Sequence, residues 1–261
     1  MVVRDVSKPR SFGRRAFLTA LAAGSAGILA AGCSSGGTQP LPGGTRVYGN
    51  PAAVGNGRAV VYSETGVGGQ ASVNAIEQDA AALEGLPAEG ARFSLSVPPG
   101  VSPVKEVSLD WQPGGHPPPG IYNVPHFDMH FYFRTAAERA LIGGGPIDTT
   151  KPAAQFVPAG YVGDPASVPG DGTHYSNPAA PEFNGEPFTN TFIYGFFEGQ
   201  MTFYEPMVTL SYLRSKPVDD VRPVSQPQAW QARGYYPQSY RVTYDATSDK
   251  YHIRLEQLTL R

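Results

Sequence analysis

Apolar and polar residues alternate along several short segments of the chain, a pattern typical of half-buried β-strands. In a strand, successive side chains point to opposite faces, so alternation gathers the apolar residues on one face. The predicted strands cover residues 58–64, 71–76, 92–97, 105–111 and 126–133. Gly- and Pro-rich turns bound most of them, which favours several short strands over a few long ones.

Two pairs of segments in the C-terminal half predict β-hairpins. The first pair is joined by Glu198-Gly199, and an X-Gly dipeptide suits a tight turn with positive φ. The second pair turns at 245–249, which contains two aspartates. The paired segments are 191–197 with 200–205, and 240–244 with 250–255.

Two short segments have helical character instead. Residues 77–84 are rich in Ala and are followed by a Gly, which predicts a helix and its end. Residues 135–142 begin at Thr135 and have Glu138 three residues later, the spacing of a capping box. Residues 207–213 fit either a strand or a helix.

Long segments rich in Pro and Gly separate these elements. The chain of 261 residues contains 31 Gly and 26 Pro, without a repeat period, so collagen-like and solenoid folds are excluded. The loops cover 112–125, 146–189 and 216–234. We expect a mainly β fold, an antiparallel barrel or sandwich with long Pro/Gly-rich loops and one or two short helices.

The N-terminal segment has the pattern of an export signal. Arg14-Arg15-Ala-Phe-Leu resembles the twin-arginine signal, and an uncharged apolar stretch follows over 16–31. This stretch ends in Leu-Ala-Ala-Gly-Cys33, which resembles the lipobox of bacterial lipoproteins. We therefore expect residues 1–32 to be a twin-arginine lipoprotein signal peptide and Cys33 to carry the lipid.

Residues 33–45 are rich in Ser, Gly and Pro and predict a flexible tether between the lipid and the domain. A single β-rich domain is expected over 46–261. Because Cys33 is the only cysteine, the mature chain has neither an internal disulfide nor a cysteine nucleophile. The expected location is extracytoplasmic and membrane-anchored, periplasmic or at the cell surface according to the host.

Charge excludes one class of partner. The first 32 residues contain five basic residues and one acidic residue, so residues 33–261 contain 15 basic and 21 acidic ones. This part of the chain has no basic stripe to neutralise phosphates, so a nucleic-acid partner is not expected. The expected membrane contact is the N-terminal lipid, and a small ligand or a protein partner stays unidentified.

The segment 126–133 carries the candidate chemistry. Its alternation places Phe and Met on one face and His126, Asp128 and His130 on the other. Positions i and i+2 of a strand are about 7 Å apart and i and i+4 about 13 Å. The pairs that suit one ion are therefore His126 with Asp128 or Asp128 with His130, whereas the two histidines are too far apart to share one.

A third ligand must come from elsewhere in the chain. The candidates are His116, His174 and Glu205. Sets of His and carboxylate ligands suit a divalent metal such as Zn²⁺, Mn²⁺ or Fe²⁺. Two alternatives stay open: the polar face is a solvated or hydrogen-bonded structural network, or it is a catalytic acid/base site. No catalytic residue is assigned, and no nucleophile elbow, Walker motif or dinucleotide fingerprint is present.

Three motifs resemble an uncharacterised bacterial domain family typified by a Thermus hypothetical protein. They are Gly-His-x-Pro-Pro-Gly-x-Tyr-x-x-Pro-His-Phe-Asp-x-His-Phe-Tyr at 115–132, Thr-Phe-Ile-Tyr-Gly-Phe at 191–196, and Met-Thr-Phe-x-Glu-Pro-Met at 201–207. The resemblance covers about residues 46–214 and leaves out the C-terminal hairpin at 240–258. It implies a β-rich domain and brings no established activity.

Three functions follow as hypotheses, and the third is an acidic structural lipoprotein that faces a partner. The first is a lipid-anchored extracytoplasmic protein that binds a ligand or partner, with a metal at the His126/Asp128/His130 face. The second is a metal-dependent enzyme of β-barrel type, in which the ion activates a bound water. The number of convergent ligands discriminates between them, because catalytic ions keep an open position and structural ions have four protein ligands.

Overall fold

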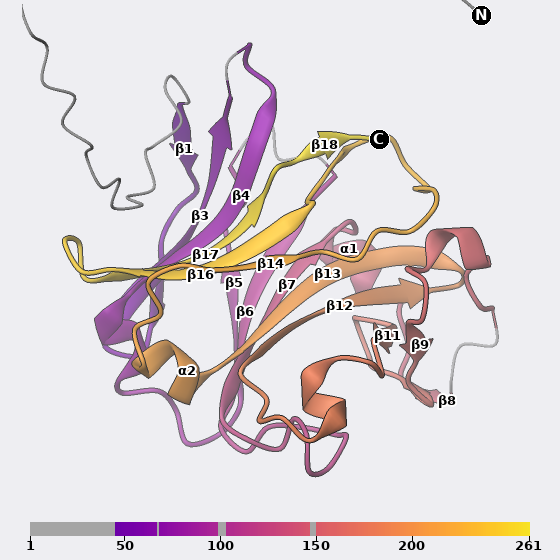
Figure 1. Ribbon diagram of the computed structural model, residues 1–261, viewed down its shortest axis with the longest axis horizontal. Helices are drawn as coiled ribbons and strands as arrows, with labels where there is room; N and C mark the ends of the chain where they lie inside the picture. Colours follow the sequence, from indigo (N-terminus) through magenta and orange to yellow (C-terminus); the bar gives the residue numbers. More distant parts are fainter. Residues whose placement is uncertain (1–44, 67, 99–102, 147–149) are drawn as a thin grey trace, which may run out of the picture. The chain divides into compact units, whose positions relative to one another are not determined.

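In the computed structural model, two antiparallel sheets pack face to face as a sandwich (Figure 1). The structure describes residues 45–66, 68–98, 103–146 and 150–261. The predicted signal peptide with Arg14 and Arg15, the lipidation site Cys33 and nearly all of the tether lie outside the described residues. Among the described residues, no helix has the length and apolar character needed to cross a membrane.

The first sheet, sheet A, has seven strands, in the order β1-β3-β4-β17-β16-β14, with β2 paired to β3. Its strands come from both ends of the described chain, so indigo β3 and β4 lie beside yellow β16 and β17 in Figure 1. The bounds are β1 Arg46–Tyr48, β2 Ala52–Val54, β3 Gly57–Thr65, β4 Ala71–Asp79, β14 Asp220–Pro223, β16 Ser239–Asp245 and β17 Lys250–Glu256.

The second sheet, sheet B, also has seven strands, in the order β5-β6-β7-β13-β12-β11-β9. The segment that carries the candidate chemistry is β7, in the interior of this sheet. The bounds are β5 Ala91–Leu95, β6 Glu106–Gln112, β7 His126–Tyr132, β9 Val162–Gly163, β11 Thr173–Ser176, β12 Asn190–Phe197 and β13 Gln200–Thr209.

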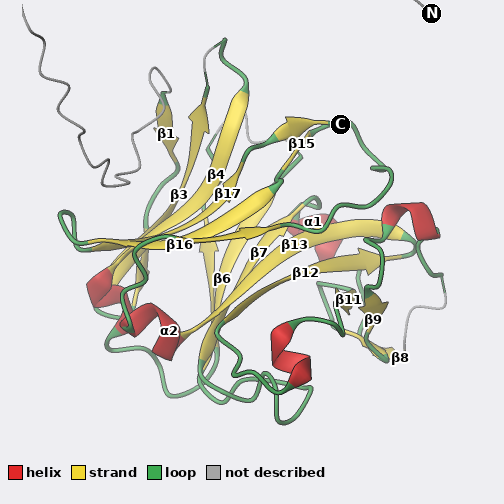
Figure 2. Ribbon diagram, in the orientation of Figure 1, coloured by secondary structure: helices red, strands yellow, loops and turns green. Residues whose placement is uncertain are grey.

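The remaining elements are short and lie in the connections, where Figure 2 shows long loops between the strands. Strands β8 and β10 form a small two-stranded sheet, and β15 and β18 form another. Their bounds, with those of the helices, are β8 Gly145–Pro146, β10 Ala166–Ser167, β15 Tyr235–Tyr236, β18 Thr259–Leu260, α1 Ala136–Arg139, α2 Leu210–Arg214, and the 3₁₀ helices η1 Ala80–Leu83, η2 Ala154–Phe156 and η3 Pro181–Asn184.

The main core fills the space between the sheets. Sheet B contributes the apolar face of each alternating strand, and sheet A contributes side chains such as Val61, Ile76 and Ile253. The aromatic residues of β12 at 192, 194 and 196 alternate along the strand and belong to this core. Of the two expected architectures the sandwich is the one observed, and the sheets do not close into a barrel.

Several predicted elements are confirmed. Both hairpins form, and Glu198 and Gly199 have the expected positive φ angles of 51° and 73°. Helix α1 has the predicted capping box of Thr135 and Glu138. Residues 207–213 contain both alternatives, since β13 continues to Thr209 and α2 follows directly.

One helix prediction is wrong. Residues 77–79 extend β4 instead of starting a helix, because they pair with β3 on one side and β17 on the other. Only residues 80–83 are helical, as a single 3₁₀ turn. Backbone hydrogen bonds from two neighbouring strands outweigh the weak local helix propensity of this segment.

Candidate metal centre

The three candidate residues of β7 lie on the outer face of sheet B, away from the main core. Between them, Phe127, Met129 and Phe131 point inward and are fully buried. The predicted alternation is therefore confirmed. The interpretation of the polar face as solvated is wrong, because only 0–4% of the His126, Asp128 and His130 side chains is exposed.

Pro-rich loops bury this outer face. A small apolar cluster packs over it, formed by Tyr122 from the loop before β7, Phe188 from the loop before β12, and Ile193 and Met207 from the sheet itself. The Phe188 ring lies against His126, with a centroid separation of 5.5 Å. The predicted loop 112–125 and the last part of 146–189 thus form a lid over the polar face. The prediction of 146–189 as one long loop is wrong in its middle, because residues 173–176 form strand β11 of sheet B.

His116, His126 and Asp128 form one group of converging ligand atoms, which we call the loop triad because His116 belongs to the loop before β7. His126 Nε2 lies 2.9 Å from Asp128 Oδ1, and His116 Nε2 lies 3.5 Å from Asp128 Oδ2. The ligand atoms of a tetrahedral ion with bonds of 2.0–2.1 Å are about 3.3 Å apart. These separations therefore fit three ligands of one ion.

His130, His174 and Glu205 form a second group, which we call the strand triad because the residues belong to β7, β11 and β13. His130 Nε2 lies 3.5 Å from Glu205 Oε1, and His174 Nε2 lies 3.4 Å from Glu205 Oε2. The register explains the convergence, since Glu205 lies between the residues that pair with Phe131 and Asp128. His174 pairs with Gly195, whose missing side chain leaves room for the Phe203 ring that contacts His174.

All six candidate residues are thus brought together, but as two groups of three. His126 and His130 belong to different groups, in agreement with their predicted separation. Of the two predicted pairs, His126 with Asp128 is observed. The pair of Asp128 with His130 is not, because Glu205 from the neighbouring strand occupies the position beside His130.

Buried ligand atoms of both triads have no hydrogen-bond partner. They are His126 Nε2 and Asp128 Oδ1 in the loop triad, which face each other at 2.9 Å without a hydrogen bond, and both ring nitrogens of His130 with Glu205 Oε2 in the strand triad. A buried polar atom without a partner costs roughly 1–3 kcal/mol, and more for a charged group. Such atoms, gathered in two groups, are arranged as the ligands of two cations would be.

The second ring nitrogen of two histidines is already occupied. His116 Nδ1 lies 2.7 Å from the Pro117 carbonyl oxygen, and His126 Nδ1 lies 2.6 Å from that of Val124. His130 Nδ1 faces Asp110 Oδ2 at 3.4 Å, an ion-pair distance without a hydrogen bond. A carbonyl or carboxylate at one nitrogen fixes the proton there and leaves Nε2 as the ligand, which is the usual arrangement of metal-binding histidines.

The electrostatics of the face favour positive charge. Burial by itself would raise the pKa of Asp128, but the neighbouring His116 and His126 hold it well below its usual range. Burial lowers the pKa of the His116 and His130 imidazoles, yet the nearby carboxylates outweigh it and raise both pKa values to about 9. Protons on these two rings therefore supply the positive charge that a metal ion would bring.

In the strand triad, the pKa values of the carboxyl group and of the second histidine shift in opposite directions. Burial raises the pKa of Glu205, and the negative charge of Asp128 adds to the effect against the opposing influence of His130. Burial, together with the charge of His130, lowers the pKa of His174 to about 4. His174 is therefore neutral at pH 7 and ready to donate its lone pair to an ion.

One functional residue, Asp110, was missed by the sequence reasoning. It lies directly opposite Asp128 in the pairing of β6 with β7. Its Oδ2 accepts a hydrogen bond of 2.9 Å from Arg92 Nε, and its Oδ1 is buried without a partner. The signal was present, because the alternation over 105–111 that places Val107, Leu109 and Trp111 in the core places Asp110 on the polar face.

Asp171 fastens the loop that leads to His174. Its Oδ1 accepts hydrogen bonds from the Tyr132 hydroxyl at 2.7 Å and from Arg139 Nη2 at 3.2 Å. Its backbone oxygen accepts a third from Thr202. The Arg139 guanidinium also lies over the Tyr132 ring, 3.5 Å from the centroid, so loop and sheet are held together at one buried point.

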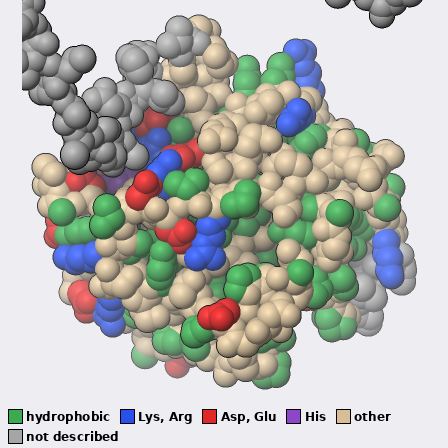
Figure 3. All heavy atoms as spheres, viewed as in Figure 1, with side chains coloured by type: hydrophobic (Ala, Val, Ile, Leu, Met, Phe, Trp, Pro, Cys, Tyr) green, Lys and Arg blue, Asp and Glu red, His purple; other side chains and the backbone are tan. Residues whose placement is uncertain are grey.

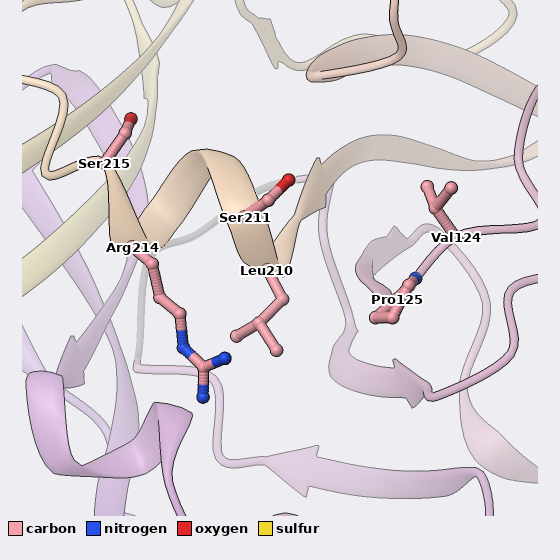
Figure 4. Close-up of a pocket in the computed structure, with 6 residues that line it drawn as sticks. All are labelled: Val124, Pro125, Leu210, Ser211, Arg214 and Ser215. Atoms are coloured by element: carbon pink, nitrogen blue, oxygen red, sulfur yellow. The ribbon is translucent and has the colours of Figure 1, made fainter.

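A separate cavity of about 540 Å³ lies at the end of β7 (Figure 4). Its lining comes from helix α2 and from Val124 and Pro125, the residues just before His126. Leu210 and Arg214 extend from the same side of α2 in Figure 4. None of the six candidate ligands lines this cavity, so it is distinct from the two triads.

On the face shown in Figure 3, acidic and basic side chains are interspersed and no large area of one sign is present. The comparisons add no further information: none of the protein-family models, curated proteins or solved structures matches the chain. The resemblance to the Thermus-typified family therefore stays a prediction.

Proposed function

We propose that this chain is a lipid-anchored extracytoplasmic protein whose domain binds divalent transition-metal ions at the outer face of sheet B. The observation that carries the proposal is the set of buried, unpartnered Nε2 and carboxylate oxygen atoms in the loop and strand triads. Mixed imidazole and carboxylate ligands suit Zn²⁺, Mn²⁺ and Fe²⁺. The anchor rests on the lipobox-like sequence at Cys33.

Three buried carboxylates favour the interpretation as a cation site over the interpretation as a network held by hydrogen bonds alone. Asp110 and Asp128 lie directly opposite each other on neighbouring strands, an arrangement that is destabilising for like charges. Glu205 lies on the next strand and is 1% exposed. Hydrogen bonds alone would satisfy such a face only if each oxygen had a donor, and Asp110 Oδ1, Asp128 Oδ1 and Glu205 Oε2 have none.

The test is direct binding of Zn²⁺ to the detergent-purified chain by isothermal titration calorimetry. The double variant His126→Ala/His130→Ala removes one ligand from each triad, and we expect its affinity to fall by at least about 100-fold, since outer partners of a metal ligand alone contribute 10–100-fold. His252→Ala is the matched control, because His252 lies on the other sheet, beside Tyr62 and Glu77.

Circular dichroism shows whether the double variant is folded. If it is not, Asp128→Asn with Glu205→Gln is the substitute, because both changes keep side-chain shape and remove charge. Wild-type protein that binds no Zn²⁺, Mn²⁺ or Fe²⁺, or a folded variant that binds as tightly as wild type, would contradict the proposal.

A metal-dependent enzyme is the second candidate function. It is favoured by the ligand count, since each triad has three protein ligands and leaves a coordination position open. A zinc-bound water in such a position is acidified and becomes a nucleophile. Hydrolysis of 4-nitrophenyl acetate by the Zn²⁺-loaded chain, lost in the His126→Ala/His130→Ala variant and kept in His252→Ala, would support this candidate. Tight binding without hydrolysis would leave the binding protein as the better description.

A further inference from the structure

The two triads differ in how their ligands are held. All three residues of the strand triad lie on strands of sheet B, whereas the loop triad takes His116 from the Pro-rich loop before β7. His116 is also the most exposed of the six, at 30%, compared with 14% for His174. Ligands on strands are held more precisely than ligands on loops.

Aromatic packing adds to this difference. In the strand triad, the Phe203 ring contacts both His130 and His174, with centroid separations of 4.8 and 5.0 Å. The Tyr132 ring stacks on His130 at 5.1 Å, nearly parallel to it, and also contacts Phe203. In the loop triad, His116 contacts the His126 ring at 4.8 Å and the Tyr122 ring at 5.8 Å, and Tyr122 belongs to the same loop and would move with it.

The partners behind the histidines differ as well. His130 is backed by the carboxylate of Asp110, which Arg92 holds in place. His116 is backed only by the carbonyl of its own neighbour, Pro117, so no distant part of the chain fixes its ring through Nδ1. On the strand-triad side, the buried bonds of Asp171 fasten the loop that leads to His174.

The triads are also separate positions. They are centred two to three residues apart along β7, which is about 7–10 Å of strand at 3.3 Å per residue. Ions that share a bridging hydroxide are about 3.5–4 Å apart. Each triad therefore suits its own ion.

We infer that the domain binds two divalent ions of different lability: a resident ion in the strand triad and an exchangeable ion in the loop triad. Release from the loop triad requires movement of the 113–125 loop and of the Phe188 ring that covers His126, and leaves sheet B intact. Release from the strand triad requires disruption of sheet B or of the buried bonds of Asp171. The inference rests on the proposed metal-binding function and adds the stoichiometry and the order of exchange.

Chelator competition tests it. The detergent-purified chain is loaded with Zn²⁺, freed of excess ion and mixed with a chromogenic chelator. We expect two kinetic phases of equal amplitude, each corresponding to one ion per chain. His116→Ala removes the fast phase and keeps the slow one, His174→Ala does the reverse, and His252→Ala changes neither.

Asp110→Asn is the sharpest variant because it leaves all six ligands in place. We expect the slow phase to become 10–100-fold faster, the usual effect of removing a carboxylate behind a ligand histidine, and the fast phase to stay unchanged. Thermal unfolding confirms that the variant is folded, and Asp110→Glu, which keeps the charge, is the alternative if it is not.

The outcomes separate the two proposals. Absence of any bound ion overturns the metal-binding function and this inference with it. One ion per chain, a single phase that releases both ions, or loss of both ions in folded His116→Ala protein overturns the inference and leaves metal binding standing.

Discussion

At the residue scale, the outer face of sheet B concentrates negative charge where water does not reach. Asp110, Asp128 and Glu205 are each at most 4% exposed and are neighbours across three strands. Burying carboxylates is costly, and an ion that binds several of them offsets that cost. Protons on His116, His130 and Glu205 offset part of it, as the raised pKa values of these three groups indicate.

This exchange of protons for metal predicts the pH dependence of binding. His116 and His130, with pKa values of about 9, are protonated at pH 7 and must lose that proton to use Nε2 as a ligand. Each triad should therefore release at least one proton for each ion that it binds. For every proton displaced, the metal affinity should fall roughly tenfold with each pH unit below 9.

Calorimetry at pH 7 in buffers of different ionisation enthalpy measures the number of protons released. Two or more protons per chain at full loading agree with the raised pKa values. Zero proton release, with an affinity that is constant between pH 6.5 and 9, would show that the imidazoles are not the ligands.

At the element scale, the alternation of β7 was enough to predict the polar face and the separation of His126 from His130. The sequence also named His116, His174 and Glu205 as partners. It could not assign them to two groups, because that depends on the order β7-β13-β12-β11, which is fixed by contacts between residues far apart in sequence. Burial was missed for a similar reason, since the lid is made of loops without periodicity.

Gly195 of β12 offers a test of the strand triad at this scale. A Cβ at this position would lie 2.0 Å from Phe203 Cε1, so Gly195→Ala must displace the ring that packs against His130 and His174. We expect a loss of about 1–3 kcal/mol in the free energy of unfolding, the usual cost of overpacking, and weaker binding at the strand triad.

Denaturant unfolding and metal titration of Gly195→Ala measure both effects. Gly114→Ala is a suitable control, because a Cβ there meets no atom within 4 Å. Wild-type stability and wild-type Zn²⁺ affinity in Gly195→Ala would contradict the described packing around Phe203.

At the scale of the whole molecule, the C-terminal segment is part of the fold even though the family resemblance stops near residue 214. Strand β17 pairs with β4 along seven residues, and Ile253 and Leu255 belong to the main core. A chain that ends at Arg214 would leave β4 with an open edge and the core of sheet A uncovered. We expect this truncated chain not to fold, and cooperative thermal unfolding with a native far-ultraviolet spectrum would contradict that expectation.

The predicted anchor is tested separately from the domain. Cys33→Ala should abolish incorporation of a labelled fatty acid and weaken membrane retention, because each buried methylene of a lipid contributes about 0.8 kcal/mol. Ser34→Ala, the neighbouring change, should keep the label. Equal labelling of Cys33→Ala and wild type would show that the lipid is elsewhere or absent.

The central claim is that the two triads hold metal ions, and anomalous diffraction from crystals grown with excess Zn²⁺ tests it most directly. The account predicts two anomalous peaks per chain: one about 2.0–2.1 Å from Nε2 of His116 and His126, the other at the same distance from Nε2 of His130 and His174. Zinc-saturated crystals with no anomalous peak at either triad would contradict it.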